Sequence, residues 1–183
     1  MEELYLIFGL GNPGKDYQFH RHNIGFSAIN HISSRPDSKS TKKFNSETTE
    51  IIINKTKVTL IKPLSYMNLS GEIVKKFKVF YKIDNKNIII IHDDLDLEFS
   101  DIRTKFDGGS AGHNGIKNII QHIGDDFTRI RVGIGHPRNI NDNYSVTNYV
   151  LGNFSKEEKK ALPDIYLEIQ KIIVNLLSQT SDK

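Results

Sequence analysis

Apolar runs of strand length alternate along the chain with segments whose apolar residues recur at helical spacing. The runs rich in Ile, Val and Leu predict strands, which lie at 4–10, 50–53, 58–62, 87–94 and 129–135. Helical spacing occurs at 23–32, 70–83 and 116–123, and again from about 155 onward. Because strands alternate with helices, the pattern predicts an α/β fold, with a single domain and a mixed, mostly parallel sheet flanked by helices.

The segments between these elements carry residues that start and stop them. Polar stretches predict one hairpin turn and two loops, at 54–57, 33–43 and 137–145. Asn23 is placed to cap the first helix, and Ser155 with Glu158 has the spacing of a capping box. Pro163 predicts a break or kink in the last helix, because proline lacks the backbone donor that a helix needs.

Composition narrows the class of protein without indicating an activity. The chain has 183 residues, of which 37% are hydrophobic and 26% charged, as in one ordinary globular domain. Cysteine is absent, which excludes disulfides, thiolate metal sites and a thiol nucleophile. We find no signal pattern and no membrane-length apolar run, so we expect a cytoplasmic protein without a membrane partner. The net charge of +3 permits a polyanionic partner but does not require one.

Three glycines close the first apolar run with the spacing G-x-G-x-x-G, at positions 9, 11 and 14. A dinucleotide-binding loop of this kind leads straight into a helix and is followed by an acidic residue about 20 residues later. Here Pro13 interrupts the loop, and positions 33–36 read Ser-Ser-Arg-Pro. We interpret "NPG" as a turn. It exposes Asn12 at the carboxyl end of a strand, where α/β sheets bind ligands.

A second motif, at 108–112, reads G-x-S-x-G and has Ser110 at its centre. A hydrolase nucleophile in this motif needs a strong strand before the serine and a helix directly after it. The preceding segment 103–107 is polar, and "HNG" at 113–115 delays the helix. The context therefore argues against Ser110 as a nucleophile.

Polar residues follow several strands directly, and the ends of parallel strands would bring them to one rim. His22, at a helix start, is the best candidate for a general base, because the positive potential there disfavours the imidazolium. Asp93 could accept the other ring N–H and stabilise the imidazolium formed during a reaction. The amides of Asn12, Asn68 and Asn114 could bind carbonyls or an oxyanion. Asn68 and Asn114 precede helices, so both could instead be N-caps.

The acidic segment "DDLD" offers a second interpretation. Asp93, Asp94 and Asp96 have carboxylates of the kind that bind divalent metals. Histidines 92, 113, 122 and 136 could add ligands, but no pair has H-x-x-x-H spacing. We expect no metal and no cofactor.

Six stretches together closely resemble bacterial-type peptidyl-tRNA hydrolases. They read "GLGNPGKDYQFHRHNIGF", "KPLSYMNLSGE", "IIHDDLDL", "GGSAGHNGIKNI", "RIRVGIGHP" and "NYVLGNFS", and they cover most of the chain from 4 to 155 in the family's order. The resemblance implies a monomeric, cofactor-free α/β enzyme that cleaves the ester between a peptide and the 3′ ribose of tRNA. Such an enzyme would recycle peptidyl-tRNA that ribosomes drop during translation.

The resemblance also implies roles for individual residues. His22 would activate water, and Asp93 would support it. Asn12 would help to distinguish blocked from free aminoacyl groups, and segment 139–154 would form a mobile lid. The remaining matches are binding positions: Tyr17, Tyr66, Asn68 and Asn114 for the substrate, and Lys105 and Arg131 for a tRNA phosphate.

The chain departs from the family pattern at three positions near these motifs. His20 stands where Thr or Ser is usual, Asp94 where Glu is usual, and Ala111 where Gly is frequent. None of these changes removes a catalytic position. Two rival functions remain open at the level of sequence, a serine hydrolase of small esters and a non-catalytic RNA-binding module.

Overall fold

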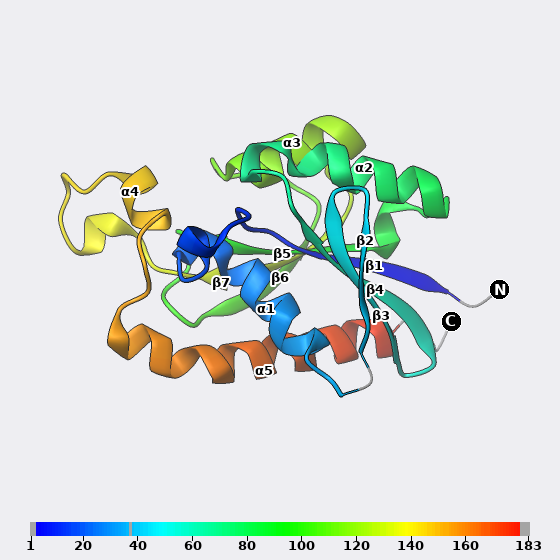
Figure 1. The fold of residues 1–183 in the computed structure, drawn as a ribbon. Helices are drawn as coiled ribbons and strands as arrows, with labels where there is room; N and C mark the ends of the chain where they lie inside the picture. The colour runs from blue at the N-terminus through cyan, green and yellow to red at the C-terminus, as the bar shows by residue number, and fades with distance from the viewer. Residues whose placement is uncertain (1–2, 37, 180–183) are drawn as a thin grey trace.

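A seven-stranded mixed sheet forms the centre of the computed structural model, which describes residues 3–36 and 38–179 (Figure 1). The strand order is β2-β3-β4-β1-β5-β7-β6. Strands β4, β1, β5 and β7 run parallel, whereas β2, β3 and β6 pair antiparallel with their neighbours. The bounds are β1 Leu4–Gly9, β2 Ser40–Lys43, β3 Ser46–Ile53, β4 Thr56–Pro63, β5 Ile88–Asp94, β6 Ile102–Phe106 and β7 Thr128–Gly133.

Helices cover both faces of the sheet, which confirms the predicted α/β class (Figure 1). One layer holds α1 and α5, and the other holds α2 and α3. The helices are α1 Ile24–Ser33, α2 Ser70–Tyr81, α3 Asn114–Ile123, α4 Val146–Val150 and α5 Lys156–Ser178. Short 3-10 turns lie between them, at η1 Lys15–Tyr17, η2 Arg21–Asn23, η3 Met67–Leu69, η4 Asn85–Asn87 and η5 Pro137–Asn139.

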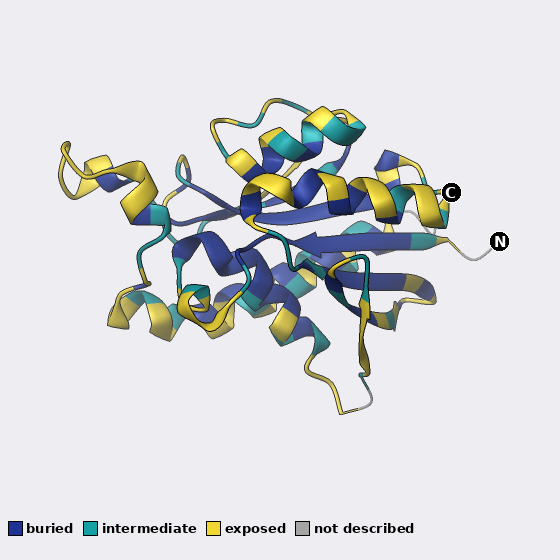
Figure 2. Cartoon of the chain, turned by 45° about the horizontal axis from the view of Figure 1, so that its top comes forward, coloured by how far each residue is buried: buried dark blue, intermediate teal, exposed yellow. Residues whose placement is uncertain are grey.

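The two cores meet at the central strands. In β1, Ile7 packs toward α1 and α5, whereas Leu6 and Phe8 pack toward α2 and α3. Strand β5 is buried along its whole length, as expected for a parallel strand covered on both faces. Figure 2 shows the buried strands between helices whose outer surfaces are exposed.

The four parallel strands end at one edge of the sheet, so the turns that follow them lie at that edge. After β1 the chain does not enter a helix at once but runs through η1 and η2 to α1. Strand β1 then packs against α1 backbone to backbone. A Cβ at Gly9 would lie 2.2 Å from the Gly25 carbonyl oxygen, and a Cβ at Gly25 would lie 2.4 Å from the Ile91 carbonyl oxygen.

Strand prediction failed where the strands lie toward the edges of the sheet. Strand β2 lies within the predicted loop 33–43, and β6 lies in the polar segment before the glycine-rich loop. Strand β3 begins at Ser46, four residues before the predicted start at 50. Both β2 and β6 are edge strands with mostly exposed residues. They therefore lack the alternation by which a half-buried strand is recognised.

The helices differ from the predictions in three details. Pro163 does not break α5, which is continuous and buries Leu162 and Ile165 on its apolar face. Packing of this face outweighs the loss of one hydrogen bond. A short helix, α4, lies in the predicted lid at 139–154. Asn23 holds the capping position of α1, but its side chain makes no capping hydrogen bond.

The capping box of α5 is confirmed, since Ser155 and Glu158 bond reciprocally. The expected domain of 1–183 includes residues 1, 2, 37 and 180–183, which lie outside the described residues. Among the described helices, none combines the length and apolar character needed to cross a membrane.

The contact between β1 and α1 generates a prediction about stability. Gly9→Ala should lower the free energy of unfolding by about 1–3 kcal/mol, because overpacking at a site that cannot relax is destabilising. Gly109→Ala is the matched control, since a Cβ there meets nothing within 4 Å. Urea denaturation of both variants measures the difference. Equal midpoints for the two variants would contradict the close contact.

Candidate active site

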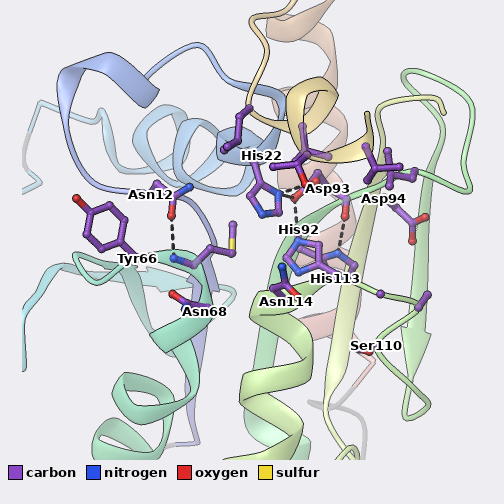
Figure 3. A pocket seen from close by; sticks show the side chains of 18 of the residues that line it. Asn12, His22, Tyr66, Asn68, His92, Asp93, Asp94, Ser110, His113 and Asn114 are labelled. Atoms are coloured by element: carbon purple, nitrogen blue, oxygen red, sulfur yellow. Dashed lines mark hydrogen bonds and ion pairs between the residues drawn. The ribbon is translucent and has the colours of Figure 1, made fainter. Parts of the chain in front are cut away.

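A cavity of about 630 Å³ opens at the carboxyl edge of the parallel strands (Figure 3). It lies where the turns after β1, β4 and β5 meet the glycine-rich loop and α4. The residues that line it include Asn12, Tyr17, His22, Tyr66, Met67, Asn68, His92, Asp93, Asp94, Ser110, His113, Asn114, Val146, Thr147, Val150 and Leu151.

His22 and Asp93 form a buried pair in this cavity (Figure 3). The turn η2 carries His22, and the end of β5 carries Asp93. The Nδ1 atom of His22 lies 2.9 Å from each carboxylate oxygen of Asp93. An ionised carboxylate only accepts hydrogen bonds, so Nδ1 must carry the hydrogen. In the neutral ring this leaves the lone pair of His22 on Nε2.

His113 is a second imidazole on the same carboxylate. Its Nε2 lies 2.9 Å from Asp93 Oδ1, and its Nδ1 accepts the N–H of Ile116 at 3.2 Å as the cap of α3. A ring nitrogen that accepts a hydrogen bond carries no hydrogen. In this arrangement His113 donates to Asp93 from Nε2. Sequence reasoning placed His113 at the same rim and gave it no role except as a possible metal ligand, because nothing in the local sequence indicates its contact with Asp93.

Opposing effects set the pKa values of the pair. Burial alone would raise the pKa of Asp93, but the charge of His22 and hydrogen bonds from both rings hold it well below its usual range. Burial would lower the pKa of His22, but the charge of Asp93 and its hydrogen bond together raise it. The expectation that the helix start depresses the pKa of His22 is therefore wrong, because the adjacent carboxylate dominates.

His92 lies beside this pair but differs from it in charge. Its Nδ1 donates to the backbone oxygen of Asp93 at 2.8 Å. Burial, aided by the nearby His113, lowers the pKa of His92 to about 3. His92 is thus neutral near pH 7 and supports the backbone at the end of β5.

Asn12 is held in one orientation by backbone groups. Its side-chain oxygen accepts the Met67 N–H at 2.8 Å (Figure 3). Its own N–H and C=O bond the side chain of Asn23, each at 2.9 Å, which explains why Asn23 does not cap α1. Because the Asn12 oxygen is occupied, its NH₂ group is the part available to a ligand in the cavity.

The other two amides line the same cavity but are more exposed. Asn68 lies in η3 and Asn114 is the first residue of α3. Neither is the N-cap of its helix, because Leu69 and His113 hold those positions. Both side chains are therefore available for a ligand.

Aromatic and apolar residues form the outer walls. The rings of Tyr17 and Tyr66 lie 6.4 Å apart, edge to face. On the other side, α4 and the residue after it present Val146, Val150 and Leu151 to the cavity. The expected lid segment therefore supplies an apolar wall.

Lys105 and Arg131 are not among the residues that line the cavity. Lys105 lies in β6 opposite Arg129, and Arg131 lies in β7 opposite Arg103. Lys105 and Arg131 are thus diagonal neighbours on one face of the sheet. The Nε of Arg131 donates to Asp94 at 2.8 Å, and Asp94 itself lines the cavity.

The structure bears differently on the two alternative interpretations, a Ser110 nucleophile and a metal site. Ser110 lines the cavity, and among the described residues no side chain hydrogen-bonds to its hydroxyl. His22, Asp93 and His113 offer ligand atoms within 4.8 Å of one another, a spacing that could hold a metal. The metal interpretation had predicted the "DDLD" acids as the core of such a site. Of these acids only Asp93 belongs to the cluster.

The His22–Asp93 pair generates a prediction about titration. In the folded protein His22 should titrate above 6.5, because Asp93 favours the charged ring. In Asp93→Asn that charge is lost and burial acts unopposed, so the pKa of His22 should fall below 6.5. NMR titration of ¹⁵N-histidine measures both values. An unchanged His22 pKa in a folded Asp93→Asn protein would contradict the coupling.

Several known proteins are similar to this chain in sequence and in fold. The family model described as peptidyl-tRNA hydrolase matches residues 6–183. The peptidyl-tRNA hydrolase of Rickettsia prowazekii is 48% identical over 159 residues, 86% of this chain and 84% of that protein. The Bartonella henselae protein of the same name is 47% identical over 175 residues, 95% of this chain and 89% of its own. The crystal structure of peptidyl-tRNA hydrolase from Acinetobacter baumannii superposes with a TM-score of 0.81 at 35% identity, covering 98% of this chain and 95% of the other. The chain belongs to the peptidyl-tRNA hydrolase family.

Proposed function

We propose that this protein hydrolyses the ester between a peptide, or an N-acyl amino acid, and the 3′ ribose of tRNA. The observation that carries the proposal is the buried pair in which Asp93 holds the Nδ1–H of His22, leaving the ring's other nitrogen free to take a proton. Membership of the family supports the substrate class. The reaction would return tRNA and peptide from peptidyl-tRNA that ribosomes drop, in the cytoplasm where translation supplies it.

The proposed reaction uses water as the nucleophile. The oxygen of a water molecule attacks the ester carbonyl carbon while Nε2 of His22 takes its proton. Asp93 stabilises the imidazolium that forms. When the bond to the ribose oxygen breaks, His22 returns the proton to that oxygen. The raised pKa of His22 favours the first transfer, in which the ring takes the proton from water.

Three amides would bind the acyl part of the substrate. The NH₂ group of Asn12 is suited to donate to a peptide carbonyl, which a free aminoacyl ester lacks. With such an ester the buried donor would stay unpaired, at a cost of about 1–3 kcal/mol. Asn68 and Asn114 are placed to bind further carbonyls or the oxyanion, and Tyr17 and Tyr66 to contact the substrate at the mouth.

The hydrogen-bond pattern favours proton transfer over metal chemistry at the His22–Asp93–His113 cluster. His113 uses Nδ1 to accept the Ile116 N–H, so the hydrogen is on Nε2. A metal at Asp93 would need a lone pair at that nitrogen. We therefore propose a reaction without metal or cofactor. Because all the proposed groups come from one chain, we propose that it acts as a monomer.

Lys105 and Arg131 would bind a phosphate of the tRNA body. Both are cations on one face of β6 and β7, outside the cavity that would hold the ester. Binding there contributes equally before and during ester cleavage. These residues would thus determine the affinity for tRNA without changing the rate of ester hydrolysis.

The first prediction of the proposal concerns the base. His22→Ala should reduce turnover of N-acetyl-aminoacyl-tRNA about 10²–10⁴-fold, the range for loss of a general base. Release of the labelled N-acetyl amino acid measures turnover, with circular dichroism to verify folding.

Ser110→Ala is the matched control in the same cavity, and it should retain turnover. A folded His22→Ala protein with wild-type turnover, together with an inactive Ser110→Ala protein, would favour the serine-hydrolase alternative. Wild-type protein that binds tRNA without any turnover would favour an RNA-binding module.

The wild-type protein should keep its full hydrolytic activity after dialysis against EDTA. A loss of activity that Mg²⁺, Mn²⁺ or Zn²⁺ restores would favour the metal alternative.

The second prediction separates phosphate binding from chemistry. The double variant Lys105→Ala, Arg131→Ala should raise KM for N-acetyl-aminoacyl-tRNA with kcat nearly unchanged. It should also flatten the dependence of log affinity on log salt by about one unit or less, since two cations on one phosphate neutralise one charge. A short N-acyl-aminoacyl nucleoside lacks that phosphate, so wild type and variant should cleave it equally. An equal defect on this truncated substrate would show that the two residues act on the ester itself.

A further inference from the structure

Arg21 is a buried charged residue directly before His22 in η2. Its Nη2 donates to the Glu158 carboxylate at 2.9 Å, and its Nη1 donates to the Tyr149 carbonyl oxygen at 3.4 Å. Its guanidinium carbon also lies 4.3 Å from the centre of the Tyr149 ring and 5.8 Å from that of Phe154. One side chain thus contacts α4, the segment after it and the start of α5.

The backbone around Arg21 joins the same segment. The Arg21 N–H donates to the Gly152 carbonyl at 3.0 Å, and the Phe154 N–H donates to the Phe19 carbonyl at 3.1 Å. His20 and Asn153 form a β-bridge between these bonds. The residues before His22 and those after α4 are therefore paired like two short strands.

The guanidinium also fills its space closely. A Cβ at Gly152 would lie 3.2 Å from Nη1 of Arg21 and 3.0 Å from the carbonyl oxygen of Asn148. The end of α4 therefore fits against the guanidinium with little room to shift.

These contacts link two walls of the cavity. His22 forms one wall and follows Arg21 in the chain. A second wall consists of Val146, Thr147 and Val150 of α4, with Leu151. Residues 138–148 are all exposed (Figure 2). The lid is therefore held at its base, where Tyr149 is buried and its hydroxyl donates to the Ile134 carbonyl oxygen at 2.6 Å.

We propose that Arg21 is a positioning residue for hydrolysis: it holds the base of α4 against the turn that presents His22, so that the apolar wall and the base keep a fixed spacing. The proposal rests on the function proposed above. Arg21 does not touch the reacting atoms and acts through His22 and α4.

The chemistry of the guanidinium suits this task. A planar guanidinium can donate to two acceptors in its plane while its face lies on an aromatic ring. A lysine ammonium in the same place cannot do both. Arg21→Lys therefore keeps the charge but loses the simultaneous hold on Glu158 and Tyr149.

The experiment compares Arg21→Ala and Arg21→Lys with Arg35→Ala, a control that removes an exposed arginine remote from the cavity. With N-acetyl-aminoacyl-tRNA, both Arg21 variants should lose kcat with little change in KM. The loss should reach about 100-fold for Arg21→Ala, the size expected of small displacements in an active site. Millimolar guanidinium should restore part of the kcat of Arg21→Ala, while equal NaCl should not, and Arg35→Ala should respond to neither.

A second variant covers the case in which Arg21→Ala does not fold. Glu158→Gln removes the ion pair but keeps the capping box, because glutamine serves at that position as well. It should lower kcat less than Arg21→Lys does. Wild-type kcat in folded Arg21→Lys and Glu158→Gln proteins would overturn the proposal, as would the absence of guanidinium rescue in a folded Arg21→Ala protein.

Amide hydrogen exchange tests whether Arg21 keeps the base of α4 in place, without any assay of hydrolysis. The Phe154 and Tyr149 amides should exchange faster in Arg21→Lys than in wild type, while amides in β5 should not change. Unchanged exchange at both amides would overturn the proposal. If wild type hydrolyses no peptidyl-tRNA, the proposed function fails, whereas the exchange result still reports on the hold of Arg21.

Discussion

The Asp93 carboxylate accepts a hydrogen bond from each of two imidazole rings while it is almost completely removed from water. A buried charge without partners would be protonated instead. The two ring N–H groups keep it ionised, and in return it fixes which nitrogen of each ring carries the hydrogen. The orientation and basicity of His22 follow from this one constraint.

The fold delivers the two rings from opposite layers. His22 comes from the turn before α1, which packs on one face of the sheet, and His113 comes from the cap of α3 on the other face. Asp93 lies at the end of β5, in the middle of the sheet and between the layers. Only a carboxylate at the end of a central strand is within reach of both, so the site depends on the sheet order as much as on its own residues.

Sequence alone predicted those features that local physical patterns determine. The apolar runs of β1 and β5 identified the central strands. The polar residues that follow these strands, with His22 at the start of the first helix, predicted that Asn12, His22 and Asp93 lie at one rim. The edge strands β2 and β6 escaped prediction because solvent on both faces removes the alternating pattern. The contact between His113 and Asp93 also escaped it, because it joins residues twenty apart in the chain through tertiary structure. The direction of the His22 pKa shift was missed because the helix start was given more weight than the Asp93 carboxylate, whose oxygens lie 2.9 Å from Nδ1.

The hydrogen bond from the Met67 backbone to Asn12 has a consequence for how the protein tolerates mutation. The donor is a main-chain N–H, so every residue type except proline supplies it at position 67. The side chain at that position can therefore be substituted as core packing requires, while the Asn12 amide keeps its orientation. Most substitutions at position 67 therefore leave the Asn12 amide, which is proposed to recognise a blocked substrate, in the same orientation.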